Sequence, residues 1–124
     1  MATNREPTGG AFISVHLNNG TGGFGAAMNG GNLTSANVVV LGDFNRDGNL
    51  DMAIGSSPIN GGLNIRLGNG TGNFPTGTTS GTSNDIRGIT DMLTADFNGD
   101  GNLDLAFTTF GGYDTAPFNA VKLL

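Results

Sequence analysis

Two short acidic stretches carry most of the chemistry that this sequence can offer. Residues 43–51 read Asp-Phe-Asn-Arg-Asp-Gly-Asn-Leu-Asp, and residues 96–104 read Asp-Phe-Asn-Gly-Asp-Gly-Asn-Leu-Asp. Each stretch places Asp or Asn at every odd position and glycine at the sixth. Two carboxylates about 4 Å apart repel one another by about 1 kcal/mol in bulk water, and by several times that near a protein surface, unless a cation lies between them. The pattern predicts that each stretch binds a divalent cation.

Calcium is the cation that this donor set favours, because calcium takes hard oxygen ligands in a short flexible loop and a glycine at the sixth position permits the sharp turn. The stretches are not EF-hands, since that motif needs a bidentate glutamate at position twelve, where this chain has Ile54 and Phe107. The alternative is a pair of turns without metal, because Asp, Asn and Gly favour turns in any case. That alternative explains one stretch better than it explains a nearly identical repetition.

Composition limits the fold and the partners. The chain has 124 residues, enough for one small domain, with 23 glycines, 36% hydrophobic residues and a net charge of −5. This charge argues against nucleic acid as a partner, and most of the acidity belongs to the two stretches. The absence of cysteine excludes disulfides, thiolate nucleophiles and cysteine zinc sites. The longest fully aliphatic run, residues 38–41, is too short to span a membrane.

The chain contains an internal repeat. Residues 13–24 match residues 63–74 at an offset of 50, and the acidic stretches match at an offset of 53. Alternating apolar residues between turn residues predict short strands and no helix. Units of about 40–50 residues with about four strands are typical of β-propeller blades. The predicted strands are 12–17, 24–28, 37–42, 50–55, 63–67, 74–79, 89–95, 103–109 and 119–124, and the apolar side chains expected beneath the loops are Phe44, Leu50, Phe97 and Leu103.

In these details the sequence resembles the FG-GAP/VCBS repeat family, known from the propeller of integrin α subunits and from secreted bacterial proteins. Residues 42–54 and 67–74 carry the resemblance, which covers roughly residues 11–124. It implies about two structural calcium ions per chain, held by the side chains at loop positions one, three, five and nine and by the carbonyl oxygen at position seven. The implied ligands are Asp43, Asn45, Asp47, Asn49 and Asp51 in the first loop, and Asp96, Asn98, Asp100, Asn102 and Asp104 in the second.

The expected fold is an all-β propeller with two four-stranded blades per chain over residues 11–124, after a flexible segment at 1–10. A partial third repeat is expected to start at 119–124. Propellers close with about four to eight blades, and two blades alone leave exposed strand edges. We therefore expect a homo-oligomer, with a trimer or a tetramer closing a ring. The alternative is that the chain is a piece of a longer propeller.

The expected function is a non-enzymatic binding, adhesion or scaffold module, because the sequence has no paired catalytic constellation. An extracellular or cell-surface setting is expected, since weak calcium sites fill only there. The alternatives are a lectin with sugar sites between blades, and an accessory domain of an enzyme; the ligand could be a glycan or a protein. His16 and its counterparts Arg66 and Lys122 are expected on solvated faces or on a ligand-binding rim. Asp91 is expected at an exposed edge or facing a ligand.

Overall fold

The computed structural model describes residues 11–33, 36–56, 62–80, 88–109 and 122–123. These residues form nine strands and no helix, which confirms the all-β prediction. The predicted flexible segment at 1–10 lies outside the described residues. The strands are β1 (Ala11–Val15), β2 (Met28–Leu33), β3 (Ala36–Gly42), β4 (Asp51–Ser56), β5 (Leu63–Leu67), β6 (Thr76–Ser80), β7 (Ile89–Ala95), β8 (Asp104–Thr109) and β9 (Lys122–Leu123).

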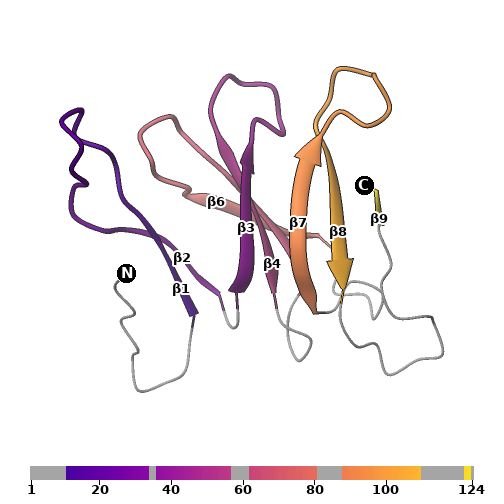
Figure 1. Cartoon of the computed structure of the whole chain (residues 1–124), viewed down its shortest axis with the longest axis horizontal. Coiled ribbons are helices and arrows are strands. Elements are labelled where there is room, and N and C mark those ends of the chain that lie inside the picture. The colour runs from indigo at the N-terminus through magenta and orange to yellow at the C-terminus, as the bar shows by residue number, and fades with distance from the viewer. Residues whose placement is uncertain (1–10, 34–35, 57–61, 81–87, 110–121, 124) are drawn as a thin grey trace.

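The strands form three antiparallel sheets that lie side by side in chain order (Figure 1). The first sheet is β1-β2, the middle sheet is β3-β4-β5-β6, and the third sheet is β7-β8-β9. The predicted grouping into two four-stranded blades is only partly present within one chain: one four-stranded sheet lies between a two-stranded and a three-stranded one. The reason is that β4 pairs with β5 of the following repeat, so that sheets and sequence repeats are out of step by half a blade.

Two predicted strands lie elsewhere than expected. The strand predicted at 24–28 is found further along the chain, as β2, which begins at Met28 and includes Gly30 and Gly31. Glycine is a weak strand former, but a β-carbon at Gly30 would collide with Ile13 of β1, so close pairing with β1 requires the missing side chain. At the other end of the chain, only Lys122 and Leu123 are described within the predicted segment 119–124.

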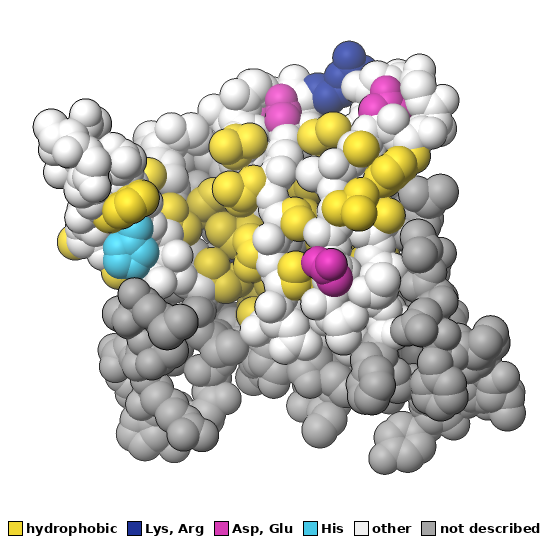
Figure 2. Space-filling model, viewed as in Figure 1, with side chains coloured by type: hydrophobic (Ala, Val, Ile, Leu, Met, Phe, Trp, Pro, Cys, Tyr) yellow, Lys and Arg dark blue, Asp and Glu magenta, His cyan; other side chains and the backbone are white. Residues whose placement is uncertain are grey.

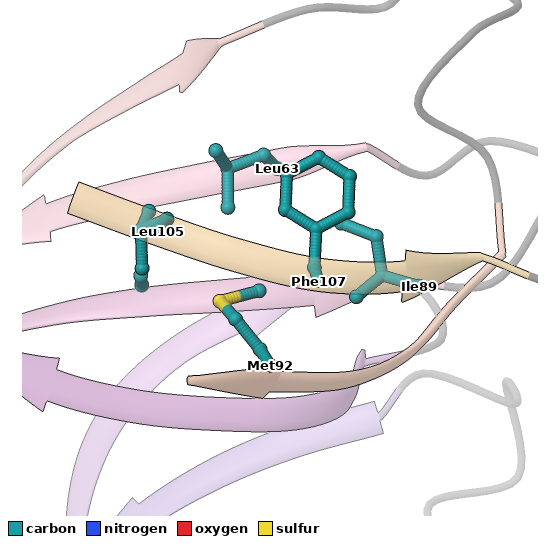
Figure 3. Packing of buried hydrophobic residues seen from close by; sticks show 6 residues of the cluster. Leu63, Ile89, Met92, Leu105 and Phe107 are labelled. Carbon is teal, nitrogen blue, oxygen red and sulfur yellow. The ribbon is translucent and has the colours of Figure 1, made fainter. Parts of the chain in front are cut away.

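The main core lies between the middle and third sheets. Figure 3 shows Leu63 of β5, Phe107 of β8 and Ile89 of β7 packed against one another, with Leu105 and Met92 beside them. Ala53 completes this buried cluster, and Val38, Val40, Phe44 and Ile65 pack against it. Each large side chain buried in this way contributes about 1.5–3 kcal/mol to stability.

Alternation along β3 decides which of its residues enter this core. Val38 and Val40 point to the third sheet and pack on the cluster, whereas Val39 and Leu41 are 40% and 49% exposed. β4, in contrast, is buried along its whole length, and it pairs with a strand on each edge. Among the described residues, no helix is long and apolar enough to cross a membrane.

The expectation that four apolar side chains plug the underside of the acidic loops is wrong for three of them. Leu50, Phe97 and Leu103 are 59%, 44% and 38% exposed, and only Phe44 packs against the core. Both loops extend beyond the ends of their strands (Figure 1), although Leu103 still reaches Gly42 of β3.

Candidate metal centre

The two acidic stretches occupy equivalent hairpin loops. The first joins β3 to β4 and closes on the pair Gly42 and Asp51, and the second joins β7 to β8 and closes on the pair Ala95 and Asp104. Both loops project at the same end of the molecule (Figure 1). The structure thus places the two sets of predicted ligands next to each other, each set on the hairpin where the first strand of a sheet turns back.

The first aspartate of each loop organises the backbone of the turn. The Asp43 carboxylate accepts hydrogen bonds from the backbone N–H of Asp47 at 3.1 Å and of Gly48 at 2.9 Å. In the second loop, Asp96 accepts from the N–H of Asp100 at 3.2 Å and of Gly101 at 2.8 Å. The repetition of the same contacts in two loops shows that the spacing of Asp and Gly determines the loop conformation.

The third and fifth positions continue this pattern. The side-chain oxygen of Asn45 accepts from the N–H of Asp47 at 3.0 Å, and its amide donates to Asp47 Oδ2 at 2.9 Å. Asp47 Oδ1 in turn accepts from the N–H of Asn49 at 2.8 Å. Asn98 and Asp100 make the same three kinds of contact in the second loop. These are turns in which an Asx side chain bonds the backbone two residues onward.

The last aspartate differs between the two loops. Asp51 is fully buried, and its two oxygens accept from the N–H of Phe44 and of Gly68, both at 2.9 Å. It therefore clamps the first loop to the turn that follows β5. A β-carbon at Gly68 would collide with the carbonyl oxygen of Leu50, so this contact needs glycine. Asp104 is half-buried and accepts from the N–H of Phe97 at 2.9 Å.

Arg46 connects the two loops. Its backbone is in the left-handed region, with φ of 63°, whereas the equivalent Gly99 has φ of 77°. A residue other than glycine rarely adopts this conformation. The guanidinium of Arg46 donates to Asn102 Oδ1 at 3.4 Å, so it places a positive charge beside the second acidic loop.

The surroundings of the aspartate at the fifth position of each loop favour its charged form. The side-chain hydrogen bond from Asn45, followed by the backbone hydrogen bond from Asn49, lowers the pKa of Asp47 below its usual value. The backbone hydrogen bond from Asn102 lowers the pKa of Asp100, with smaller contributions from Asn98 and from the Arg46 charge. Both carboxylates are therefore ionised at neutral pH, as ligands of a cation must be.

The donor chemistry fits calcium, but the carboxylates are spread along the loops. Asp, Asn and backbone oxygens are the ligands that calcium takes. Among the residues that the structure describes, no three His, Cys, Asp or Glu side chains come together as a metal-binding group. Each aspartate already accepts loop N–H donors and keeps further lone pairs, because a carboxylate offers about four acceptor sites. The ten predicted ligands lie in two matched loops, and their role as ligands stays a prediction.

Comparison with known families agrees with this geometry. The model of the FG-GAP-like repeat matches residues 43–107, just over half of the chain. The chain belongs to the FG-GAP-like repeat family. The predicted resemblance is confirmed, and the FG-GAP-like match runs from the start of the first loop into β8, so that it includes both loops and strands β4 to β7. FG-GAP-like repeats imply a fold of the β-propeller type. No curated protein and no solved structure matches the chain.

The other singled-out residues have separate environments. His16 is exposed, and its Nδ1 lies 3.1 Å from the carbonyl oxygen of Gly25. Arg66 is half-buried, and its guanidinium lies against Gly31 of β2, which leaves too little room there for a side chain. It is therefore not on a fully solvated face. The side chain of Lys122 lies outside the described residues. Asp91 is exposed on β7, away from both loops.

Sequence reasoning missed the two roles that depend on tertiary contacts. Gly68 serves as the donor that holds Asp51, and Arg46 bridges to the second loop. A signal for the first existed, because residues 67–74 belong to a repeated turn. The only signal for the second was the replacement of glycine by arginine at one loop position, Arg46 in place of Gly99.

Proposed function

We propose that this chain is a calcium-binding, non-enzymatic binding or adhesion module of the β-propeller type, in which calcium has a structural role. The observation that carries the proposal is the duplicated loop. Asp43 and Asp96, and likewise Asp47 and Asp100, make matching hydrogen bonds in two hairpins of the same shape. A turn that served only to reverse the chain would not need three aspartates in each copy.

The residues that would hold the ions are the five odd-numbered positions of each loop. Asn49 and Asn102 would contribute their backbone carbonyl oxygens, and the other eight would contribute side-chain oxygens. Bound calcium supplies positive charge that offsets the repulsion among three carboxylates in one loop. The loop residues supply the rest, because their hydrogen bonds orient the aspartates before an ion arrives.

A non-catalytic, extracellular role is part of the same proposal. Loops of this kind belong to the range of calcium affinities found in extracellular modules, with dissociation constants of about 10⁻⁴–10⁻³ M, which the calcium of the cytosol would not fill. The described residues offer no nucleophile paired with a base near His16, whose ring faces a backbone carbonyl. Hydrolytic activity in the isolated chain would contradict this part of the proposal.

Thermal unfolding with calcium and with a chelator tests the metal sites. If the dissociation constant is 10⁻⁴–10⁻³ M, a calcium concentration of about 10 mM stabilises each occupied site by about 1.4–2.7 kcal/mol. We expect Asp47→Ala and Asp100→Ala each to remove about half of the calcium-dependent rise in Tm. Asn73→Ala is the control, because Asn73 is exposed and lies outside the two acidic loops, and it should keep the full rise. An equal Tm with and without calcium in the unmodified chain would refute the proposal.

The ligand of such a module stays open to experiment. Carbohydrate binding between blades is the alternative to protein adhesion, and several weak sites in one assembled ring would gain avidity. Binding on a glycan array that persists at low glycan density would support the alternative. Silence across a broad array would leave protein adhesion as the role to pursue.

We also propose that copies of the chain assemble into a closed ring, as a trimer or a tetramer. The support for this is the set of large apolar side chains that the described part of a single chain leaves in the open. They include Val39 and Leu41 on β3 and Leu93 on β7.

A further inference from the structure

One face of the middle sheet is covered over only half of its width. Residues paired across an antiparallel ladder share a face, so Val39 lies on the same face as Ile54, and Leu41 on the same face as Met52. Ile54 and Met52 are buried, with exposures of 0% and 2%, whereas Val39 and Leu41 are 40% and 49% exposed. The β1-β2 sheet covers the β5 side of this face, where Arg66 meets Gly31. We call Val39 and Leu41 the outer face of β3.

A second apolar surface lies on the third sheet. Met92 points into the core, and its neighbours along the strand, Asp91 and Leu93, therefore point away from it. Leu93 is 54% exposed and is paired with Ala106 across the ladder. Figure 2 shows hydrophobic side chains in the open over the region of β3 and β7. We call Asp91 and Leu93 the outer face of β7.

The contact inside the chain indicates what these two faces fit. The loop offset of 53 makes β7 the equivalent of β3, so that Leu93 corresponds to Val40 and Met92 to Val39. Within the chain, Val40 packs against the core of the next sheet, and Met92 is part of that core. The outer face of β7 therefore corresponds to the face of β3 that packs on the following sheet. The outer face of β3 corresponds to the face of β7 that packs on the preceding sheet.

The strand edges point to the same arrangement. The repeat makes β1 the equivalent of β5 and β8 the equivalent of β4. β5 pairs with β6 on one edge and with β4 on the other, whereas β1 pairs, among the described residues, only with β2. The edge of β1 left open is thus the one that matches a β4-like strand. The corresponding edge of β8 is paired, among the described residues, with only the two residues of β9.

We propose that copies of this chain join head to tail, with the outer face of β7 of one copy packed on the outer face of β3 of the next. The β1 strand of that next copy pairs with β8 along the edge that β9 occupies, and takes the place of β9. This rests on the proposed ring and names the surfaces that form it. The contact is heterologous, so the same two surfaces repeat around the ring until it closes. Strands β7-β8 of one copy and β1-β2 of the next then form a four-stranded sheet like the middle one.

The proposal fixes a register. In the middle sheet, Ile65 pairs with Ala53 and Leu63 with Gly55. β1 corresponds to β5 at an offset of 50 residues, and β8 corresponds to β4 at an offset of 53. The equivalent pairs between copies are therefore Val15 with Ala106 and Ile13 with Thr108. Within a single chain β1 and β8 lie at opposite ends of the row of sheets, so the same residues cannot meet there (Figure 1).

Light scattering after gel filtration tests the faces. The unmodified chain is expected at three or four times its mass of 12.5 kDa. Leu93→Asp and Leu41→Lys should each give monomers, whereas their equimolar mixture should recover larger species, because each variant keeps the face that the other has lost. Leu50→Asp is the matched control, since Leu50 is a similarly exposed leucine on a loop, and it should keep the full mass. An unmodified chain that is monomeric, or variants that assemble as well as the control, would overturn the proposal.

A disulfide between copies tests the strand exchange. The chain has no cysteine, so Ile13→Cys and Thr108→Cys can be introduced together. Opposed residues in an antiparallel pair have α-carbons about 4.5–5.5 Å apart, which a disulfide accepts. Oxidation should give covalent dimers and larger products on a non-reducing gel, and a variant with Ile13→Cys and Leu50→Cys should not. An assembled protein that fails to cross-link would refute the exchange. Retention of the calcium effect on Tm in the Leu93→Asp monomer would show that the metal proposal stands separately.

Discussion

Replacement of Asp51 by alanine separates the structural part of the first loop from its metal chemistry. The Asp51 carboxylate is fully buried and accepts hydrogen bonds from two backbone N–H groups, those of Phe44 and Gly68. A buried donor that loses its partner costs about 1–3 kcal/mol. We therefore expect Asp51→Ala to lower the free energy of unfolding by about 2–6 kcal/mol. For a domain of this size that is a large part of a total of about 6–19 kcal/mol.

Asp104 supplies the comparison, because it holds the same position in the second loop with a different set of contacts. It is half-buried and accepts from one described backbone donor, the N–H of Phe97. Asp104→Ala should therefore cost about 1–3 kcal/mol, roughly half as much. Asp51→Asn should cost less than Asp51→Ala, because the amide keeps one of the two acceptor oxygens.

The assay is urea unfolding in the presence of a chelator, at one protein concentration, followed by circular dichroism. A shift of the midpoint with an unchanged m-value reports a change in stability. The chelator removes any contribution of bound metal, so the difference between the two alanine variants reports the hydrogen bonds alone. Equal costs for Asp51→Ala and Asp104→Ala in chelator would refute the reasoning. A difference that appears only with calcium would mean that Asp51 acts as a ligand alone and that its two hydrogen bonds do not clamp the loop.

Two further predictions follow from the loop geometry. Gly68→Ala should destabilise the chain by about 1–3 kcal/mol, since the new methyl group meets the carbonyl oxygen of Leu50. Gly25→Ala is its control in the same urea assay, because its β-carbon finds only ordinary contacts. In acid, the lowered pKa values of Asp47 and Asp100 predict that stability is fully present above the ordinary aspartate pKa of 3.8 and is lost as the pH falls through the lower folded values. The free energy of unfolding of the double variant Asp47→Asn/Asp100→Asn, measured in chelator, should vary less with pH in that range. The same pH dependence in the variant and the unmodified chain would contradict the lowered pKa values.

The acidic loops show what spacing alone can decide. Asp43 and Asp96 bond the backbone four and five residues onward, and these contacts need nothing beyond the loop itself. The repeat and the family were therefore recognisable from the residues. The buried state of Asp51 was not, because it depends on Gly68, which lies 17 residues away on another strand connection.

The strand count was predictable, but the sheets were not. Short apolar segments between turn residues indicate where a strand runs, and they do so for β3, β4, β5, β7 and β8. It does not indicate which neighbour a strand pairs with, and the division of nine strands into two, four and three follows from ladders that cross the repeat boundary. The exposure of Leu50 and Phe97 was likewise hidden, because an apolar residue in a loop is buried only if some other element lies opposite it.

The sequence by itself determined the local features of this protein: two oxygen-rich loops, their conformation, the β class and the repeat. These depend on contacts within a few residues, which the order of the side chains dictates. Only the tertiary structure decided that Val40 enters the core while Val39 and Leu41 stay open, and that β1 pairs on one edge alone within the part of the chain that the structure describes. Burial depends on what lies across each face, and residues far apart in the chain supply it.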